Sequence, residues 1–121
     1  MSTRCQIGFY ENNPGSPQIA LIYQHYDGDP KTMLPKLIKI HQSFKEHRGY
    51  YDPSYLAART LQKLMNESDK DVNETIKESF KNEMLVTGFG IDNELHADLS
   101  HFYQIYENLI IVDGKKEYKI T

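Results

Sequence analysis

Alternating apolar and polar residues mark strands at both ends of the chain. Residues 3–10 and 19–25 each alternate with a period of two, which is typical of half-buried strands. A loop rich in Asn, Pro and Gly separates them and predicts a hairpin. Further strands are predicted over 85–91, 101–107, 109–113 and 116–120. The Asp113-Gly114 pair between the last two is a strong signal for a type I′ turn.

Helical periodicity occupies the middle of the chain. Asp29-Pro30 combines an N-cap residue with a proline at the first helical position, and Arg48-Gly49 is a typical helix end. Asp52-Pro53 starts a second helix by the same logic. The predicted apolar faces are Met33, Leu34, Leu37, Ile40, His41 and Phe44 for the first helix, and Leu56, Ala57, Leu61, Leu64 and Met65 for the second.

The segment 66–83 differs from its neighbours, because it is rich in charged and amide residues with only Val72, Ile76 and Phe80 spaced by four. We interpret it as a third, mostly exposed helix and as a surface insertion in one domain spanning 1–121. Strands at both ends around a helical block favour an α+β fold. We therefore expect an antiparallel sheet with two to three helices packed on one face.

Composition narrows the possible classes of protein. A length of 121 residues suits one domain, and a formal charge of −3 excludes a strongly basic duplex-coating protein, although a local basic patch is compatible with it. We expect nucleic acid not to be the partner. One cysteine excludes an internal disulfide and a multi-cysteine zinc site. No apolar run reaches the ~18 residues of a membrane span and the start lacks a signal core, so we expect a cytoplasmic protein.

Candidate chemistry concentrates where the second strand meets the first helix. After Tyr23, a histidine and two acids (His25, Asp27 and Asp29) lie within five residues beside a helix start, whose free amides can bind anions. This pattern fits a corner that handles a metal or a phosphate. The alternative is structural: Asp27-Gly28 forms the turn and Asp29 caps the helix.

A second His-x-Asp pair occurs at His96 and Asp98. The two pairs could meet across a sheet and supply nitrogen and carboxylate ligands for Zn²⁺, Mn²⁺ or Fe²⁺. His-x-Asp is short, so chance matches are frequent, and we assign no metal or other cofactor. Of the remaining histidines, His41 is expected at the core or its boundary and His47 exposed near a helix end.

Arginines and tyrosines are the other residues suited to binding. Arg4 and Arg59 could form bidentate contacts with phosphate or carboxylate, or structural ion pairs with Asp27 or Asp98. Nine tyrosines suit either strand packing or a binding surface. We predict that one binding site gathers near one end of the sheet, with Arg59 facing it from the second helix. Its members are Arg4, Tyr23, His25, Asp27, Arg59, His96 and Asp98.

No established catalytic signature occurs in the sequence, which lacks a P-loop, a G-x-S-x-G elbow and an H-E-x-x-H motif. Gly88-Phe89-Gly90 is too short for a nucleotide loop, and Cys5 fits a small core residue better than a nucleophile. We therefore assign no catalytic residue.

Five short motifs resemble a group of small uncharacterised proteins of bacteriophages, archaeal viruses, plasmids and prophages. The motifs are Ser2-Thr3-Arg4, Tyr23-x-His25-x-Asp27-Gly28-x-Pro30, Asp52-Pro53-x-Tyr55-x-Ala57-Ala58-Arg59, Gly88-x-Gly90-Ile91 and His96-x-Asp98. The resemblance covers most of the chain except 66–83. The chain departs from the group at Asp29, where a Tyr is usual, and at Ala97, where a Gly is common. The resemblance implies an accessory protein of a mobile element, many of which counter host defence.

Three functions remain open from the sequence. The first is a non-enzymatic accessory protein that binds a host protein or a small nucleotide, with a homodimer as one assembly state. The second is a metal-dependent phosphoesterase or nuclease that uses the paired His-x-Asp motifs. The third is a viral structural or assembly protein. A basic, aromatic-lined pocket would favour nucleotide binding, whereas a flat acidic face would favour blocking of a protein.

Overall fold

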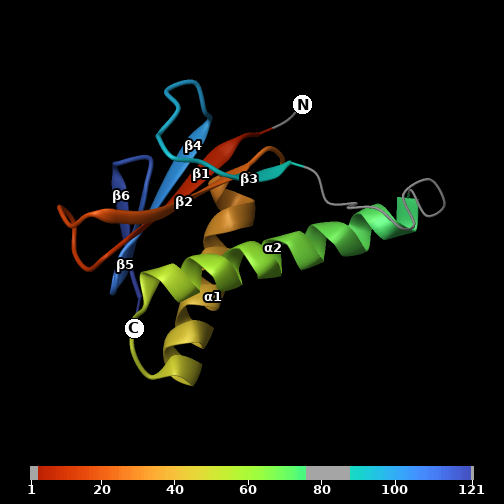
Figure 1. The fold of residues 1–121 in the computed structure, drawn as a ribbon. Coiled ribbons are helices and arrows are strands. Elements are labelled where there is room, and N and C mark those ends of the chain that lie inside the picture. Colours follow the sequence, from red (N-terminus) through yellow and green to blue (C-terminus); the bar gives the residue numbers. More distant parts are fainter. Residues whose placement is uncertain (1–2, 76–87, 121) are drawn as a thin grey trace.

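The computed structural model describes residues 3–75 and 88–120, with the side chains of 68–75 left out. In this part of the chain, six strands form one sheet and two helices pack on it (Figure 1). The helices are α1 (Pro30–Arg48) and α2 (Pro53–Thr75). The strands are β1 (Cys5–Tyr10), β2 (Gln18–Gln24), β3 (Phe89–Ile91), β4 (His101–Ile105), β5 (Leu109–Val112) and β6 (Lys116–Lys119).

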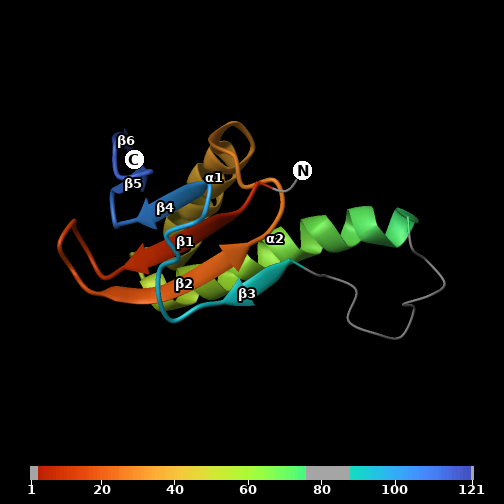
Figure 2. The ribbon, with the colours of Figure 1, turned by 90° about the horizontal axis from the view of Figure 1, so that it is seen from above.

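The sheet has the order β3-β2-β1-β4-β5-β6. The predicted α+β fold is confirmed, but the sheet is mixed rather than antiparallel, because β1 and β4 pair in parallel. After β3, the segment 92–100 crosses β2 and β1 on the face opposite the helices and delivers β4 beside β1 (Figure 2). From the sequence we expect antiparallel pairing throughout. Strands joined by a tight hairpin must be antiparallel, but β1 and β4 are joined by a long stretch of chain and can therefore pair in parallel.

Both helices cover one face of the sheet, and the core lies between the helices and the sheet (Figures 1 and 2). Cys5, Ile7 and Phe9 are wholly buried there, as the alternation in the first strand predicts. Met33 and Leu37 of α1 are buried in the same core. The other face of β1 carries Gln6, whose polar contacts are described below.

Both predicted ends of α1 and the predicted tight turn are confirmed. The Asp29 carboxylate accepts hydrogen bonds from the amide of Thr32 at 3.2 Å and from its hydroxyl at 2.9 Å. Gly49 ends α1 with a φ of 86°, a left-handed conformation that glycine adopts without strain. Asp113 and Gly114 have φ values of 56° and 66°, which is the requirement of a type I′ turn.

The acidic segment after residue 65 continues a helix instead of starting one. α2 runs without a break to Thr75, and in Figure 1 its end extends beyond the sheet. The prediction of a separate third helix is therefore wrong for 66–75, while 76–83 lie outside the described residues. The interpretation of 66–83 as a surface insertion stays a prediction. Of the predicted strand 85–91, residues 85–87 lie outside the described part of the chain, Gly88 is a bend and 89–91 form β3. None of the described helices is long and apolar enough to cross a bilayer.

Two residues assigned to the core from the sequence are confirmed. Cys5 is fully buried, and burial raises the pKa of its thiol to about 12, so the reactive thiolate is absent near neutral pH. His41 is also fully buried. Its Nε2–H donates to the carbonyl of Tyr106 at 2.7 Å, and its ring stacks on Tyr51 with centroids 5.5 Å apart.

The buried His41 predicts a loss of stability in mild acid. Burial lowers the pKa of His41 from 6.5, so below that pH the unfolded chain binds a proton that the folded chain does not. The free energy of unfolding should then fall as the pH drops below about 6.5, by up to ~1.4 kcal/mol per pH unit.

Urea denaturation between pH 7 and pH 5 measures this slope. His41→Gln keeps a donor for Tyr106 and should flatten the slope, whereas His47→Gln, at an exposed position on the same helix, should leave it unchanged. A proton NMR titration of His41 in the unmodified protein gives an independent check. Titration of its ring at the ordinary pH would contradict the prediction.

Candidate functional site

Four of the seven predicted site residues form one connected polar network on the face of the sheet opposite the helices. The Arg4 Nε–H donates to the hydroxyl of Tyr23 at 3.0 Å, and that hydroxyl lies 2.5 Å from Nδ1 of His25. Arg4 also lies 3.6 Å from the carboxylate of Asp98, whose side chain is 73% exposed. The ion pair of Arg4 with Asp98, one of the alternatives that the sequence left open, is thus present.

His96 belongs to a neighbouring contact set that is organised by Gln6, a residue missed in the sequence. The Gln6 amide is almost wholly buried; it donates to the Asp92 carboxylate at 2.7 Å and to the carbonyl of Glu94 at 3.1 Å. Its oxygen accepts the backbone N–H of His96 at 2.9 Å. Gln6 thus connects the segment 92–100, which crosses the sheet, to β1 through three hydrogen bonds. The alternation placed Gln6 on the polar face, but nothing nearby in the sequence indicated its partners.

The two His-x-Asp pairs do not combine into a shared metal site within the described residues. There, no three His, Cys, Asp or Glu side chains are grouped so that they could hold a metal ion. His25 contacts Tyr23, and the imidazole of His96 lies 3.6 Å from Asp92. Asp27 is exposed in the turn with a φ of 57°, and Asp29 caps α1, so the turn and the cap of the structural interpretation are both present.

Arg59 lies on the helical layer, far from its predicted place at the sheet. It is exposed, and its guanidinium donates to the side-chain oxygen of Gln62 at 3.2 Å. Among the described side chains of α2, those of Leu56, Ala57, Thr60 and Leu64 are buried. With 3.6 residues per turn, Arg59 is rotated away from this buried stripe. The prediction that Arg59 faces the sheet is therefore wrong.

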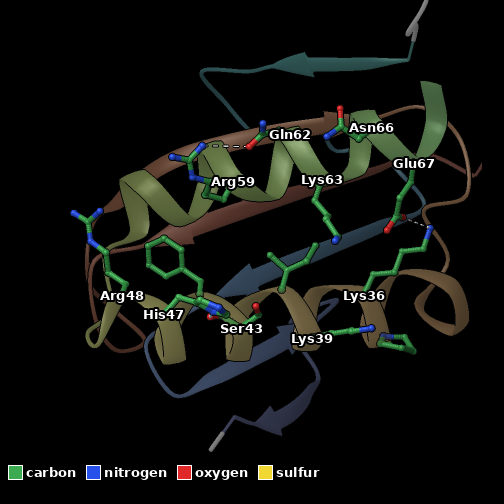
Figure 3. Close-up of a pocket in the computed structure, with 13 residues that line it drawn as sticks. Lys36, Lys39, Ser43, His47, Arg48, Arg59, Gln62, Lys63, Asn66 and Glu67 are labelled. Carbon is green, nitrogen blue, oxygen red and sulfur yellow. Dashed lines mark hydrogen bonds and ion pairs between the residues drawn. The ribbon is translucent and has the colours of Figure 1, made fainter. Parts of the chain in front are cut away.

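Arg59 instead lines a groove between α1 and α2, which we call the interhelical groove (Figure 3). Its volume is about 860 Å³, and its walls run from Pro35 to Arg48 on α1 and from Arg59 to Glu67 on α2. The partly buried side chains of Ile40 and Phe44 add apolar surface to it. The groove thus combines an apolar lining with long polar side chains.

The charge of the interhelical groove is opposite to that of the whole chain. Among the described residues, five cationic side chains and one carboxylate line it. The cationic residues are Lys36, Lys39, Arg48, Arg59 and Lys63. The carboxylate is that of Glu67, which lies 3.3 Å from Lys36. The groove is therefore strongly basic in a chain with a formal charge of −3.

Arg48 marks one end of the interhelical groove and Glu67 lies at the other (Figure 3). The guanidinium carbon of Arg48 is 4.2 Å from the ring centroid of Tyr55 and 5.2 Å from that of Tyr50. These two rings are half exposed, at 51% and 56%. Arg48 also donates to Asp52 at 3.3 Å. The Arg48 Nε–H also donates to the Tyr50 hydroxyl at 3.0 Å. A cation in contact with two half-exposed aromatic side chains thus lies at this end.

Sequence reasoning missed this groove because net charge is summed over the whole chain. A signal was present: Lys36 and Lys39, and likewise Arg59 and Lys63, have the spacing of neighbours on one helix face. That the two faces are adjacent follows only from the packing of the helices. In the described part of the chain, Lys39, Arg59 and Lys63 make no ion pair, so their charges are available to a ligand.

Comparison with known proteins identifies no relative: no family model, no curated protein and no solved structure matches the chain. The resemblance to proteins of mobile elements stays a prediction. The geometry of the interhelical groove therefore carries the functional argument.

Proposed function

We propose that this is a non-enzymatic binding protein that holds a small nucleotide in the interhelical groove. The observation that carries the proposal is the gathering of five Lys and Arg side chains, against a single carboxylate among the described residues, around an apolar lining. Cations neutralise phosphates, and Arg adds bidentate hydrogen bonds. Its volume of about 860 Å³ lies within the ~300–1,000 Å³ usual for small-molecule sites.

Binding is favoured over turnover by the kind of side chains at the groove. Glu67, the carboxylate among the described lining residues, is paired with Lys36, and the imidazole of His47 in the same lining is 2.8 Å from the Ser43 carbonyl oxygen through its Nδ1. The site therefore offers charge neutralisation and apolar contact rather than a matched acid and base. A concave basic surface also suits a nucleotide better than it suits the blocking of a basic protein face.

The biological role that we propose follows from the resemblance to accessory proteins of phages and other mobile elements. A protein that binds a nucleotide without consuming it lowers the free concentration of that nucleotide. Sequestration of a nucleotide used by a host defence system would fit such an accessory protein. This part of the proposal depends on the resemblance, whereas the binding site depends on the groove.

Calorimetric titration with ATP tests the proposed binding. The double variant Arg59→Glu/Lys63→Glu should weaken ATP binding by about 100-fold or more, since each contact between a cation and phosphate contributes ~1.5–3 kcal/mol. The control is Lys115→Glu/Lys116→Glu, two exposed lysines near the β5–β6 turn, which makes the same change in net charge. Equal losses in both variants would point to non-specific attraction, and no ATP binding by the unmodified protein would refute the proposal.

A further inference from the structure

We infer that the interhelical groove binds a short single-stranded oligonucleotide, of about five nucleotides or fewer, in preference to a mononucleotide. This inference rests on the proposed function and names the ligand class of the same site. Three features carry it: the distribution of cations along the groove, the exposed rings at one end, and the apolar lining between them.

The cations extend over more length than one phosphate group requires. On α1 they run from Lys36 to Arg48, and a rise of ~1.5 Å per residue separates these positions by about 18 Å along the helix. Arg59 and Lys63 line the facing wall on α2, where Lys63 extends toward α1 (Figure 3). A strand with stacked bases advances ~3.4 Å per nucleotide, so about five nucleotides span this distance at most.

The end of the groove at Arg48 offers aromatic rings on which a base can stack. Tyr50 and Tyr55 are not lining residues of the groove, but their half-exposed rings contact Arg48, which is one. Stacking of a base on an aromatic ring contributes ~1–3 kcal/mol and tolerates any base. Arg48 places a positive charge beside the rings, so a base and its phosphate can be bound together at this end. Ile40 and Phe44 add apolar surface to the groove between Lys36 and Arg48.

The carboxylates of an acidic peptide would pair with the same cations. An acidic peptide has no flat base, however, that could stack on the two half-exposed rings beside Arg48. The chain as a whole is acidic, which opposes the coating of long duplexes. A short strand confined to the groove avoids the negative charge elsewhere. The features together therefore favour a ligand that alternates phosphates with flat bases.

Calorimetric titration of the full chain tests the inference with AMP, with oligoadenylates of two, five and ten nucleotides, with inorganic triphosphate and with a pentaglutamate peptide. Affinity should rise by at least about tenfold from AMP to the five-mer, and the ten-mer should add only the statistical gain from more binding positions. The log–log salt slope should steepen by about −0.7 for each phosphate neutralised. Tyr50→Ala/Tyr55→Ala should weaken five-mer binding about tenfold more than triphosphate binding.

The other outcomes separate the two proposals. AMP binding as tight as the five-mer overturns the inference and leaves the proposed function standing. Equal effects of the tyrosine variant on the five-mer and on triphosphate overturn the role of the rings. Pentaglutamate binding as tight as the five-mer identifies an acidic peptide instead. Failure of every phosphate ligand to bind overturns both proposals.

Discussion

Gly28→Ala is expected to destabilise the protein by about 3 kcal/mol, at the upper end of the cost of overpacking a core. A Cβ at this position would lie 2.7 Å from the carbonyl oxygen of Thr3 and 2.8 Å from Cβ of Cys5. The backbone cannot easily yield, because the N–H of Gly28 donates to Thr3 at 2.9 Å and its carbonyl accepts the hydroxyl of Tyr103 at 2.7 Å.

Urea denaturation of the variant measures this cost. Gly90→Ala is the matched control: Gly90 lies in β3, and no described atom beyond its chain neighbours lies within 4 Å of the position that a Cβ would take there. Its free energy of unfolding should stay within about 0.5 kcal/mol of the unmodified protein. Similar stabilities for the two alanine variants would show that the contact around Gly28 is not tight.

Gln6→Leu is expected to cost about 2 kcal/mol and to loosen the segment that crosses the sheet, because a buried polar group left without a partner costs ~1–3 kcal/mol. The substitution removes the partner of the His96 N–H, of the Glu94 carbonyl and of the Asp92 carboxylate. Water can reach part of this segment and bind some of the groups left without a partner, which limits the decrease in the free energy of unfolding.

Hydrogen exchange and urea denaturation test the prediction together. Exchange should accelerate at His96, whose N–H donates to Gln6, while the core strand β1 keeps its protection. The control is Gln18→Leu, because Gln18 is exposed on the adjacent strand and its side chain accepts, among the described residues, from Tyr10. Unchanged exchange at His96 in the Gln6 variant would mean that other contacts hold the segment.

The predicted clustering of the site residues is confirmed where they are close in the sheet and is wrong where helix rotation decides. Arg4, Tyr23, His25 and Asp98 are connected, because the β1–β2 hairpin and the crossing segment bring them together. Arg59 is on the other layer, since a rotation of one residue about a helix axis changes direction by ~100°.

Local features of the fold were determined by the sequence alone. The burial of Ile7 follows from the alternation around it, the start of α1 from Asp29, and the tight hairpin from Asp113-Gly114. Each depends on residues within a few positions, so propensity, capping and backbone conformation suffice to predict it.

Only the tertiary structure decided which distant residues meet. The parallel pairing of β1 with β4, the contact of Gln6 with His96 and the interhelical groove all join parts of the chain that local patterns do not relate. The physical reason is that packing two helix faces side by side concentrates charges such as Lys39 and Lys63 in one place. A net charge of −3, summed along the sequence, carries no information about that arrangement.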